Sequence, residues 1–254
     1  MDSIFALVSV SEFLFALGIA VLAGFVKGVV GFAMPLVLIS GLTTFMSPEL
    51  ALAGLILPTL VSNAMQALRQ GFAAAWESIV RFRVFLLVGG ITLFASAQMV
   101  RLVSDRAMLL IIGTPVVLFA LLQLSGYRFK GVRKTPALEA SVGGFAGLIG
   151  GVSGIWGPPT VAYLTALETA KRDQMRIQGV IYGLGAVALM GAHIGSGVLR
   201  AETAPFSATL IIPAALGMWI GGLVSDRFDQ DTFRRATLFV LLLAGLNLLR
   251  RAFF

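Results

Sequence analysis

Two ionisable side chains lie inside long apolar stretches of the sequence. Lys27 is the only charged residue between Phe13 and Met46, and His193 is the only histidine in the chain. A lysine at membrane depth is costly unless it is paired or faces water, so Lys27 predicts a place that attracts an anion. The alternative is a lysine that snorkels from a helix end to the cytoplasmic interface. His193 changes charge near neutral pH and is a candidate for proton coupling, although a neutral hydrogen-bonding role between helices is favoured.

Glycine and proline interrupt the apolar runs at two places that are similar to each other. At an offset of 123 residues (147 − 24), the matching pairs are Gly24 with Gly147, Gly28 with Gly151, Val29 with Val152, Gly31 with Gly154 and Pro35 with Pro158. A break within the membrane must be buried in protein or line a wet cavity, because freed backbone groups cannot stay bare in hydrocarbon. Two half-helix N-termini at such breaks would favour an anion. The alternative is that the glycines only allow close helix packing.

Polar side chains in two apolar runs add to these breaks. Asn63 and Gln66 lie in the third run, whereas Gln178 and Tyr182 lie four residues apart, on one helical face, in the eighth. Such groups either hydrogen-bond an oxyanion or join helices, and the sequence leaves both readings open. The predicted substrate-binding set comprises Lys27, Gly28, Gly31, Pro35, Asn63, Gln66, Ser153, Gly154, Trp156, Gly157, Pro158, Gln178 and Tyr182.

The sequence lacks motifs for catalysis, cofactors and metals. It has no cysteine, which excludes disulfides, thiolate metal sites and cysteine nucleophiles. No HExxH, phosphate-binding loop or Ser/His/Asp spacing is found, and one histidine without nearby acids predicts no metal site. The formal charge of +7 comes from basic residues in short loops between apolar runs, so nucleic acid is not an expected partner.

The composition requires lipid as the solvent for much of the surface. Of the 254 residues, 58% are hydrophobic and 12% are charged, against roughly a quarter charged in an average soluble domain. A spanning helix needs about 20 apolar residues, and continuous apolar runs predict an all-α polytopic membrane protein rather than a barrel. The ten candidate runs are Ile4–Val26, Gly28–Met46, Leu50–Leu68, Val84–Val100, Ala107–Tyr127, Ala140–Gly151, Gly157–Leu167, Ile177–Leu199, Ala204–Ser225 and Ala236–Leu249.

Loop charges predict two inverted repeats of about five segments, residues 1–130 and 131–254, which together form one transmembrane domain. The sixth and seventh runs are too short to span alone, so each repeat is expected to hold a broken or re-entrant helical hairpin. With both termini outside, and Lys27 set aside, 13 of the 19 basic residues fall in cytoplasmic loops and 5 fall outside. Parallel repeats of four spans give 10 inside and 8 outside, so the positive-inside bias favours inversion. The first run is expected to be retained, since Asp2 and Glu12 replace a basic signal-peptide start.

The residues around the two breaks resemble the paired signatures of the TauE/SafE family of bacterial sulfite and organosulfonate exporter-like permeases. The likeness is in Gly24–Pro35 and, more clearly, in Ala146–Tyr163, whose sequence is AGLIGGVSGIWGPPTVAY. The length, the two halves and the basic central loop agree with the family along nearly the whole chain. Many members carry glycines before the first proline, where this chain has Phe32, Ala33 and Met34.

This resemblance implies export of a small sulfur-containing anion, such as sulfite, sulfoacetate or a related organosulfonate, across the bacterial cytoplasmic membrane. The residues themselves support a narrower reading, which is a cavity between broken helices that favours negative charge. A membrane-embedded enzyme or assembly factor, or an anion channel, remains an alternative use of the same cavity. The expected partners are the anion, the lipid bilayer and, as an open point, a second copy of the chain in a homodimer.

Overall fold

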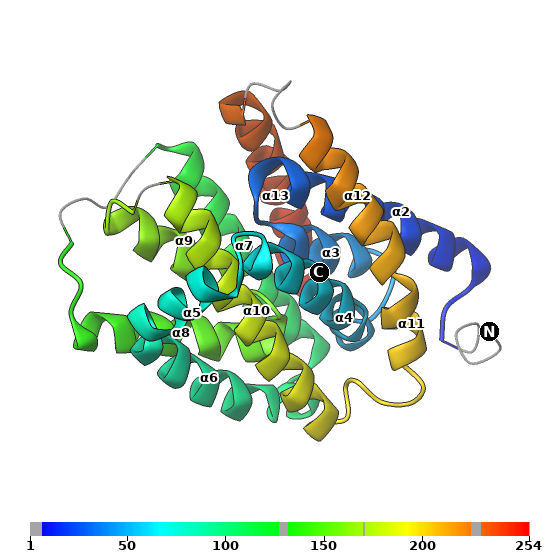
Figure 1. Ribbon diagram of the computed structural model, residues 1–254. Helices are drawn as coiled ribbons and strands as arrows, with labels where there is room; N and C mark the ends of the chain where they lie inside the picture. Colours follow the sequence, from blue (N-terminus) through cyan, green and yellow to red (C-terminus); the bar gives the residue numbers. More distant parts are fainter. Residues whose placement is uncertain (1–6, 127–131, 170, 225–229, 254) are drawn as a thin grey trace.

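All regular elements in the described part of the chain are helices, which confirms the all-α prediction (Figure 1). The computed structural model describes residues 7–126, 132–169, 171–224 and 230–253. Among these residues six helices are long and apolar enough to cross a membrane, or seven if the bent pair Phe72–Arg81 and Arg83–Ala97 is counted as one span. The chain is therefore a multi-pass membrane protein. The predicted segment ends at Ile4, Tyr127 and Ser225 and the repeat boundary at 130–131 lie outside the described residues.

The first half of the chain folds into two long helices around a short one, followed by a bent pair and a further long helix. Its helices are α2 (Val10–Val30), α3 (Met34–Leu42), α4 (Pro48–Leu68), α5 (Phe72–Arg81), α6 (Arg83–Ala97), a 3-10 turn η1 (Val100–Leu102) and α7 (Asp105–Leu124). Helix α3 folds back along α2, since a Cβ on Gly41 would meet the side chain of Ile19. The first predicted hairpin is thus a long helix, a break and a half-helix.

The second half repeats this order, including a short helix in the place of α5. Its helices are α8 (Pro136–Ser153), α9 (Gly157–Ala166), α10 (Lys171–Gly195), α11 (Ala204–Thr209), α12 (Ile211–Val224) and α13 (Gln230–Phe253). Helices α11 and α12 together make one candidate span, Ala204–Val224. Each of the ten predicted segments therefore has a helical counterpart, in the order in which the sequence places them.

The helix contacts map onto each other when the two halves are exchanged. Helix α2 packs on α12 and, correspondingly, α8 packs on α6. The contacts of α3 with α13 and of α9 with α7 correspond in the same way, whereas α4 with α10 and α7 with α13 are each a helix against its own counterpart. The two halves are thus two copies of one packing scheme around a shared pair of central helices, α4 and α10.

Counterpart helices run antiparallel where they meet. Along α4 from Asn63 to Ala67, the neighbours on α10 move backwards from Gly183 to Gly179. Gly113 of α7 meets Leu249 of α13, whereas Val117 meets Gly245. A two-fold axis relates two helices in antiparallel directions only when the axis is perpendicular to the helices. The packing is therefore compatible with the predicted inverted repeats, in which the axis lies in the membrane plane.

Glycines on the outer helices of each half bring backbones into direct contact. A Cβ on Gly24 or Gly28 would collide with the backbone of α12, and a Cβ on Gly143 or Gly147 would collide with the backbone of α6. Small residues at spacing four are typical of close helix packing in lipid, where the apolar effect between helices is weak. The packing alternative therefore describes these four glycines.

Several predicted segment ends differ from the helix ends, among them Val26, Gly28 and Ile177, and two of the differences have identifiable reasons. The sixth segment was expected at Ala140–Gly151, but α8 begins at Pro136 because Glu139 is buried in its first turn. The Glu139 carboxylate accepts a hydrogen bond from the Phe85 amide at 3.1 Å and pairs with Lys134 at 3.2 Å, so the charge is compensated. Helix α5 occupies the predicted loop between the third and fourth segments, and it lies at 79° to α6.

Candidate functional site

Two residues with left-handed backbone conformation form the first break, between α2 and α3. Helix α2 ends at Gly31, which has φ 81°, and α3 begins after Ala33, which has φ 75°. Glycine adopts this region freely, whereas a residue with a Cβ pays roughly 1–2 kcal/mol. Helix α3 has no side-chain cap and carries Pro35 near its start. The chain thus reverses within three residues and points the uncapped N-terminus of α3 at the protein interior.

The second break has the same design with one left-handed residue. Helix α8 ends at Gly154, which has φ 72°, and α9 starts with Gly157, Pro158 and Pro159 and has no side-chain cap. Prolines are suited to the first turn of a helix, because the amides that they lack have no intrahelical acceptor there. The Ser153 hydroxyl accepts a hydrogen bond from the Ile155 amide at 3.1 Å and stabilises the turn.

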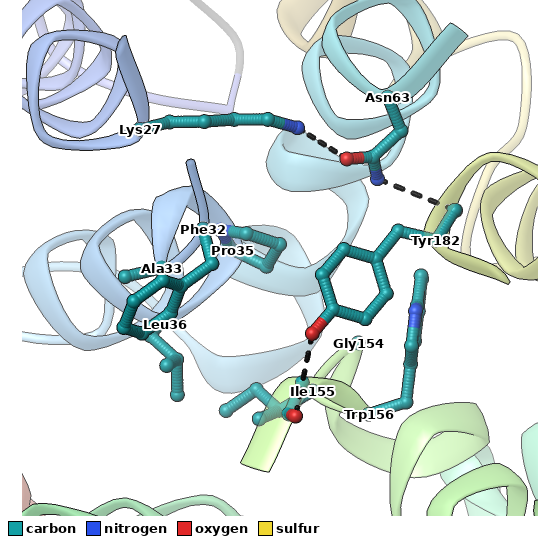
Figure 2. A pocket seen from close by; sticks show the side chains of 11 residues that line it. Lys27, Phe32, Ala33, Pro35, Leu36, Asn63, Gly154, Ile155, Trp156 and Tyr182 are labelled. Atoms are coloured by element: carbon teal, nitrogen blue, oxygen red, sulfur yellow. Dashed lines mark hydrogen bonds between the residues drawn. The ribbon is translucent and has the colours of Figure 1, made fainter. Parts of the chain in front are cut away.

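Both breaks line one cavity, with an empty volume of about 370 Å³ that includes the open space at its mouth. The first half contributes Lys27, Phe32, Ala33, Pro35, Leu36 and Asn63. The second half contributes Gly154, Ile155, Trp156, Gly157 and Tyr182. Figure 2 shows Lys27 and Asn63 on one side of this space and Trp156, beside Tyr182, on the other. Most lining residues are buried, whereas Phe32, Pro35 and Gly157 are partly exposed.

Lys27 lies within this site and does not reach the surface. Its side chain is only 3% exposed, so the snorkelling alternative is wrong. Its ammonium donates hydrogen bonds to the Ser62 hydroxyl at 3.0 Å and to the Asn63 side-chain carbonyl. Among the described residues no carboxylate lies within ion-pair distance of Lys27, and the cavity lining contains no acid.

A hydrogen-bonded path runs from Lys27 to the second break. Asn63 receives the Lys27 ammonium on its oxygen and donates through its Nδ2 to the backbone carbonyl of Tyr182 at 3.3 Å (Figure 2). The Tyr182 hydroxyl donates to the carbonyl of Gly157 at 3.4 Å. The charged group of one half is therefore linked, through the central helices α4 and α10, to the half-helix of the other.

Gln66 and Ser153 support the breaks from behind rather than lining the cavity. The Gln66 amide donates to the carbonyl of Gly31 at 3.1 Å and to that of Met175 at 3.2 Å, which ties the first break to α4 and α10. The Ser153 hydroxyl also donates to the carbonyl of Ile149 at 2.7 Å. Both residues satisfy backbone groups that the breaks release from helical bonding.

Besides Gly31, Gln66 and Ser153, four predicted residues lie outside the cavity lining. Gly28 packs against the backbone of α12, as described above. Pro158 and Gln178 are buried in α9 and α10 without lining the cavity. His193 is fully buried near the end of α10, where its Nδ1 lies 3.1 Å from the Ser196 hydroxyl. Its Nε2 lacks a well-formed hydrogen bond, although the backbone of Gly151 lies beside the ring.

Sequence reasoning missed Ser62 and four residues that complete the cavity wall. The wall residues are Phe32, Ala33, Leu36 and Ile155. Ser62 was within reach, because Thr59, Ser62, Asn63 and Gln66 follow each other at helical spacing and form one polar stripe on an apolar helix. The wall residues carry no such signal, since apolar side chains beside a break look like any other lipid-facing or packed residue.

The arrangement can stabilise an anion and holds no metal site. A buried ammonium and two uncapped half-helix N-termini face one cavity, and each favours negative charge. Among the described residues no group of three or more His, Cys, Asp or Glu side chains could hold a metal ion. The hydrophobic side of the cavity, formed by Phe32, Leu36 and Trp156, would contact an apolar part of the bound molecule.

Comparison with known proteins identifies the family but no individual relative. The model of the family described as "Sulfite exporter TauE/SafE" matches residues 16–248. No curated protein and no solved structure matches the chain. The family match spans both breaks, Lys27 and the two central helices, in agreement with the resemblance noted from the motifs. The chain belongs to the TauE/SafE family of sulfite and organosulfonate exporter-type membrane permeases.

Proposed function

We propose that this chain is a secondary transporter that exports a small sulfur-containing anion, such as sulfite, sulfoacetate or a related organosulfonate, across the bacterial cytoplasmic membrane. The family membership supports a permease for this class of substrate. The observation that carries the proposal is the buried Lys27 ammonium, which has no acidic partner among the described residues of the cavity that both breaks line.

An unpaired ammonium inside the membrane favours an anion in its neighbourhood. Taking a charge out of water costs several kcal/mol unless an opposite charge or strong hydrogen bonds compensate it. Ser62 and Asn63 offer only neutral oxygens to Lys27. A bound oxyanion would complete this coordination, and the uncapped starts of α3 and α9 would add a few amide donors, such as Gly157 N–H, because Pro35, Pro158 and Pro159 carry no N–H.

The cavity wall favours an anion with a small organic group. Trp156, Phe32 and Leu36 offer apolar surface opposite the polar pole at Lys27 and Asn63. A sulfonate head would lie at the polar pole, and its carbon substituent would contact the apolar wall. An inorganic oxyanion would leave that wall facing water or empty space, so we expect organosulfonates to be moved more efficiently than sulfite.

The burial of the polar residues favours a carrier over an open channel. Lys27, Asn63 and Trp156 are at most 4% exposed, so no wide water-filled path leads past them. Broken hairpins in inverted repeats are a common construction of carriers that work by alternating access. The family description supports the proposed outward direction, and His193, away from the cavity, is the candidate for proton coupling.

The test is anion flux through the purified chain in liposomes. Vesicles loaded with ethanesulfonate, sulfoacetate or sulfite are diluted into anion-free buffer, and efflux is followed with and without a proton gradient. We expect saturable efflux that is lost in Lys27→Ala and in Gly157→Leu and kept in Gly18→Leu, whose added side chain enters open space on the outer face of α2.

Three results would overturn the proposal in different ways. A folded protein that moves none of the three anions would exclude anion transport of this class. Conversion of the anion without transmembrane movement would favour a membrane-embedded enzyme. Flux that does not saturate and is far faster than carrier turnover would favour an anion channel.

A further inference from the structure

A second hollow lies behind Trp156. It is an apolar groove between α6 and α10, with an empty volume of about 860 Å³ that includes the open space at its mouth, and Gly143 and Gly147 of α8 lie along its floor. Trp156 lines this groove and also lines the central cavity. Its indole is seated against Gly150 of α8 and Gly185 of α10, where a Cβ would come within 3.0 and 3.1 Å of it. One side chain is therefore the common wall of both spaces.

The groove opens toward lipid along its length. Leu87 of α6 and Leu184 of α10 line it and are 65% and 40% exposed. Gly90, also in the lining, has no heavy atom within 4 Å of the place where a Cβ would stand. The surface is thus hollow, apolar and open at the depth where acyl chains surround the protein.

A basic residue without an acidic partner stands at one end of the groove. Arg83 lines the groove at the start of α6 and is exposed. In the described part of the chain the acids at this end have other partners, since Glu77 lies 3.9 Å from Arg176 and Glu139 lies 3.2 Å from Lys134. The guanidinium of Arg83 is therefore available to a negatively charged group outside the protein.

The position of helix α5 indicates that Arg83 lies at the membrane depth of the lipid headgroups. Its residues Phe72, Trp76 and Val80, spaced by four, are 73%, 56% and 52% exposed and form one apolar face. The helix lies at 79° to α6. A short amphipathic helix across the direction of a spanning helix, with an aromatic outer face, is typical of the membrane interface. The groove therefore runs from the interface, at Arg83, into the hydrocarbon, at Trp156.

We propose that this groove holds one acyl chain of an anionic phospholipid whose phosphate binds Arg83. The chain packs against the face of Trp156 that points away from the central cavity. The positive charge of Arg83 favours an anionic headgroup, and the apolar hollow between α6 and α10 accommodates the acyl chain. The lipid is then a structural part of the cavity wall, a role that neither the family membership nor the proposed transport assigns to it.

Lipid selectivity tests the headgroup contact. The purified full chain is titrated with phosphatidylglycerol and phosphatidylcholine of identical chains, and bound lipids are counted by native mass spectrometry. Because one Arg at the membrane surface favours an anionic lipid by a factor of about five, we expect Arg83→Gln to lower the preference for phosphatidylglycerol about fivefold. Gly90→Leu, which fills the groove, should lose the tightly bound lipid of either kind.

The matched control is Gly18→Leu. Gly18 also has open space around a Cβ, and it lies in a hollow on α2 whose lining residues, Ser11, Leu14, Phe15, Ile19 and Leu22, include no basic side chain. This variant should retain the lipid as the unchanged protein does. The proposal is wrong if Arg83→Gln keeps the full preference, or if Gly18→Leu removes as much lipid as Gly90→Leu.

Trp156 itself reports the acyl chain. The chain has three tryptophans, so Trp76→Phe and Trp219→Phe together leave Trp156 as the only one. In vesicles of brominated phosphatidylglycerol we expect strong quenching of its fluorescence, although Trp156 is only 4% exposed, and a clear loss of quenching after Gly90→Leu. Equal quenching in the two proteins would show that no chain enters the groove. Neither readout depends on transport, so this result stands or falls apart from the proposed function.

Discussion

The two breaks share a backbone plan but divide the chemistry between them. At the offset of 123 residues, Lys27 corresponds to Gly150 and Ala33 corresponds to Trp156. The first break thus supplies charge and a strained, small residue, whereas the second supplies a large aromatic wall seated on glycine. Both halves contain a half-helix, and the side chains at corresponding positions differ in kind. A symmetric frame therefore holds an asymmetric site.

The asymmetry extends to the central helices. The Asn63 side chain of α4 binds Lys27, and the corresponding position of α10 is Ala186, which is fully buried. Gly31 meets Met175 and Gly154 meets Leu52, and these two neighbours are also 123 residues apart (175 − 52). The correspondence of the packing is thus close enough for single positions to be compared. At Asn63 and Ala186, a polar side chain in one half corresponds to an apolar side chain in the other.

The largest expected effect is on the apparent affinity for the anion, and it concerns Asn63 beside Lys27. Asn63→Asp would place a carboxylate beside Lys27 and supply the counter-ion that we assign to the substrate. Because a hydrogen bond to a charged group contributes about 1.5–3 kcal/mol, we expect the apparent affinity for a sulfonate to fall roughly 10- to 100-fold in liposome flux. Asn63→Gln is the uncharged control. Unchanged affinity in Asn63→Asp would contradict the counter-ion role of the substrate.

The second expected effect concerns the aromatic half. Gly150→Leu would push into Trp156, whose ring atoms lie 3.0 Å from the position of a Cβ. Overpacking of this kind costs about 1–3 kcal/mol, so thermal unfolding in detergent should occur at a clearly lower temperature. Gly18→Leu, in open space, should leave the unfolding temperature nearly unchanged. Equal stability of the two variants would show that Trp156 is not held by this glycine.

The third expected effect is a gain in stability at the first break. Ala33 has φ 75°, a conformation that glycine adopts without strain. Ala33→Gly should raise the free energy of unfolding by roughly 0.5–1 kcal/mol, after the entropy of glycine in the unfolded chain is deducted. Ala23→Gly, at a buried position inside α2, should lower it by about 1 kcal/mol. If both substitutions destabilise, the backbone at Ala33 carries no strain that glycine relieves.

The smallest expected effect separates the two serines beside the breaks. Ser62→Ala removes one of two neutral acceptors of Lys27 and should change the apparent affinity for the anion about two- to tenfold. Ser153→Ala removes the acceptor of the Ile155 amide and should affect unfolding more than affinity. Affinity is read from saturable efflux and stability from thermal unfolding. A reversed pattern would mean that the two halves do not divide their roles as proposed.

The sequence predicted the order of the helices and the place of the breaks, because continuous apolar runs and Gly/Pro breaks are local signals. It also predicted Lys27, since a single charge in a long apolar stretch stands out. The depth of Lys27 could not be predicted, because it depends on the end of α2 at Val30. The packing of Trp156 against Gly150 and Gly185 could not be predicted either, because it brings together residues of two different helices.

The burial of Glu139 shows where a local rule fails. An acid just before an apolar run usually marks the boundary of a membrane segment. Helix α8 nevertheless includes Glu139 and begins three residues earlier, at Pro136. Its partners, the Phe85 amide and Lys134, come from the other half and from the loop before the helix. Compensation by distant groups cannot be read from the run itself. The amphipathic α5 was missed for a similar reason, since its ten residues fall below the length expected of a span.

The contact between Arg251 and Thr43 bears on the order in which this protein is made. The Arg251 guanidinium donates to the backbone carbonyl of Thr43, at the end of α3, across 208 residues of sequence. Helix α13 also packs on α3. A ribosome releases the N-terminal hairpin long before it synthesises residue 251, so this hairpin must wait in the membrane for its last partner. Final assembly of the first hairpin therefore waits for the synthesis of α13, and a substitution at Arg251 would act on a structure 208 residues earlier in the chain.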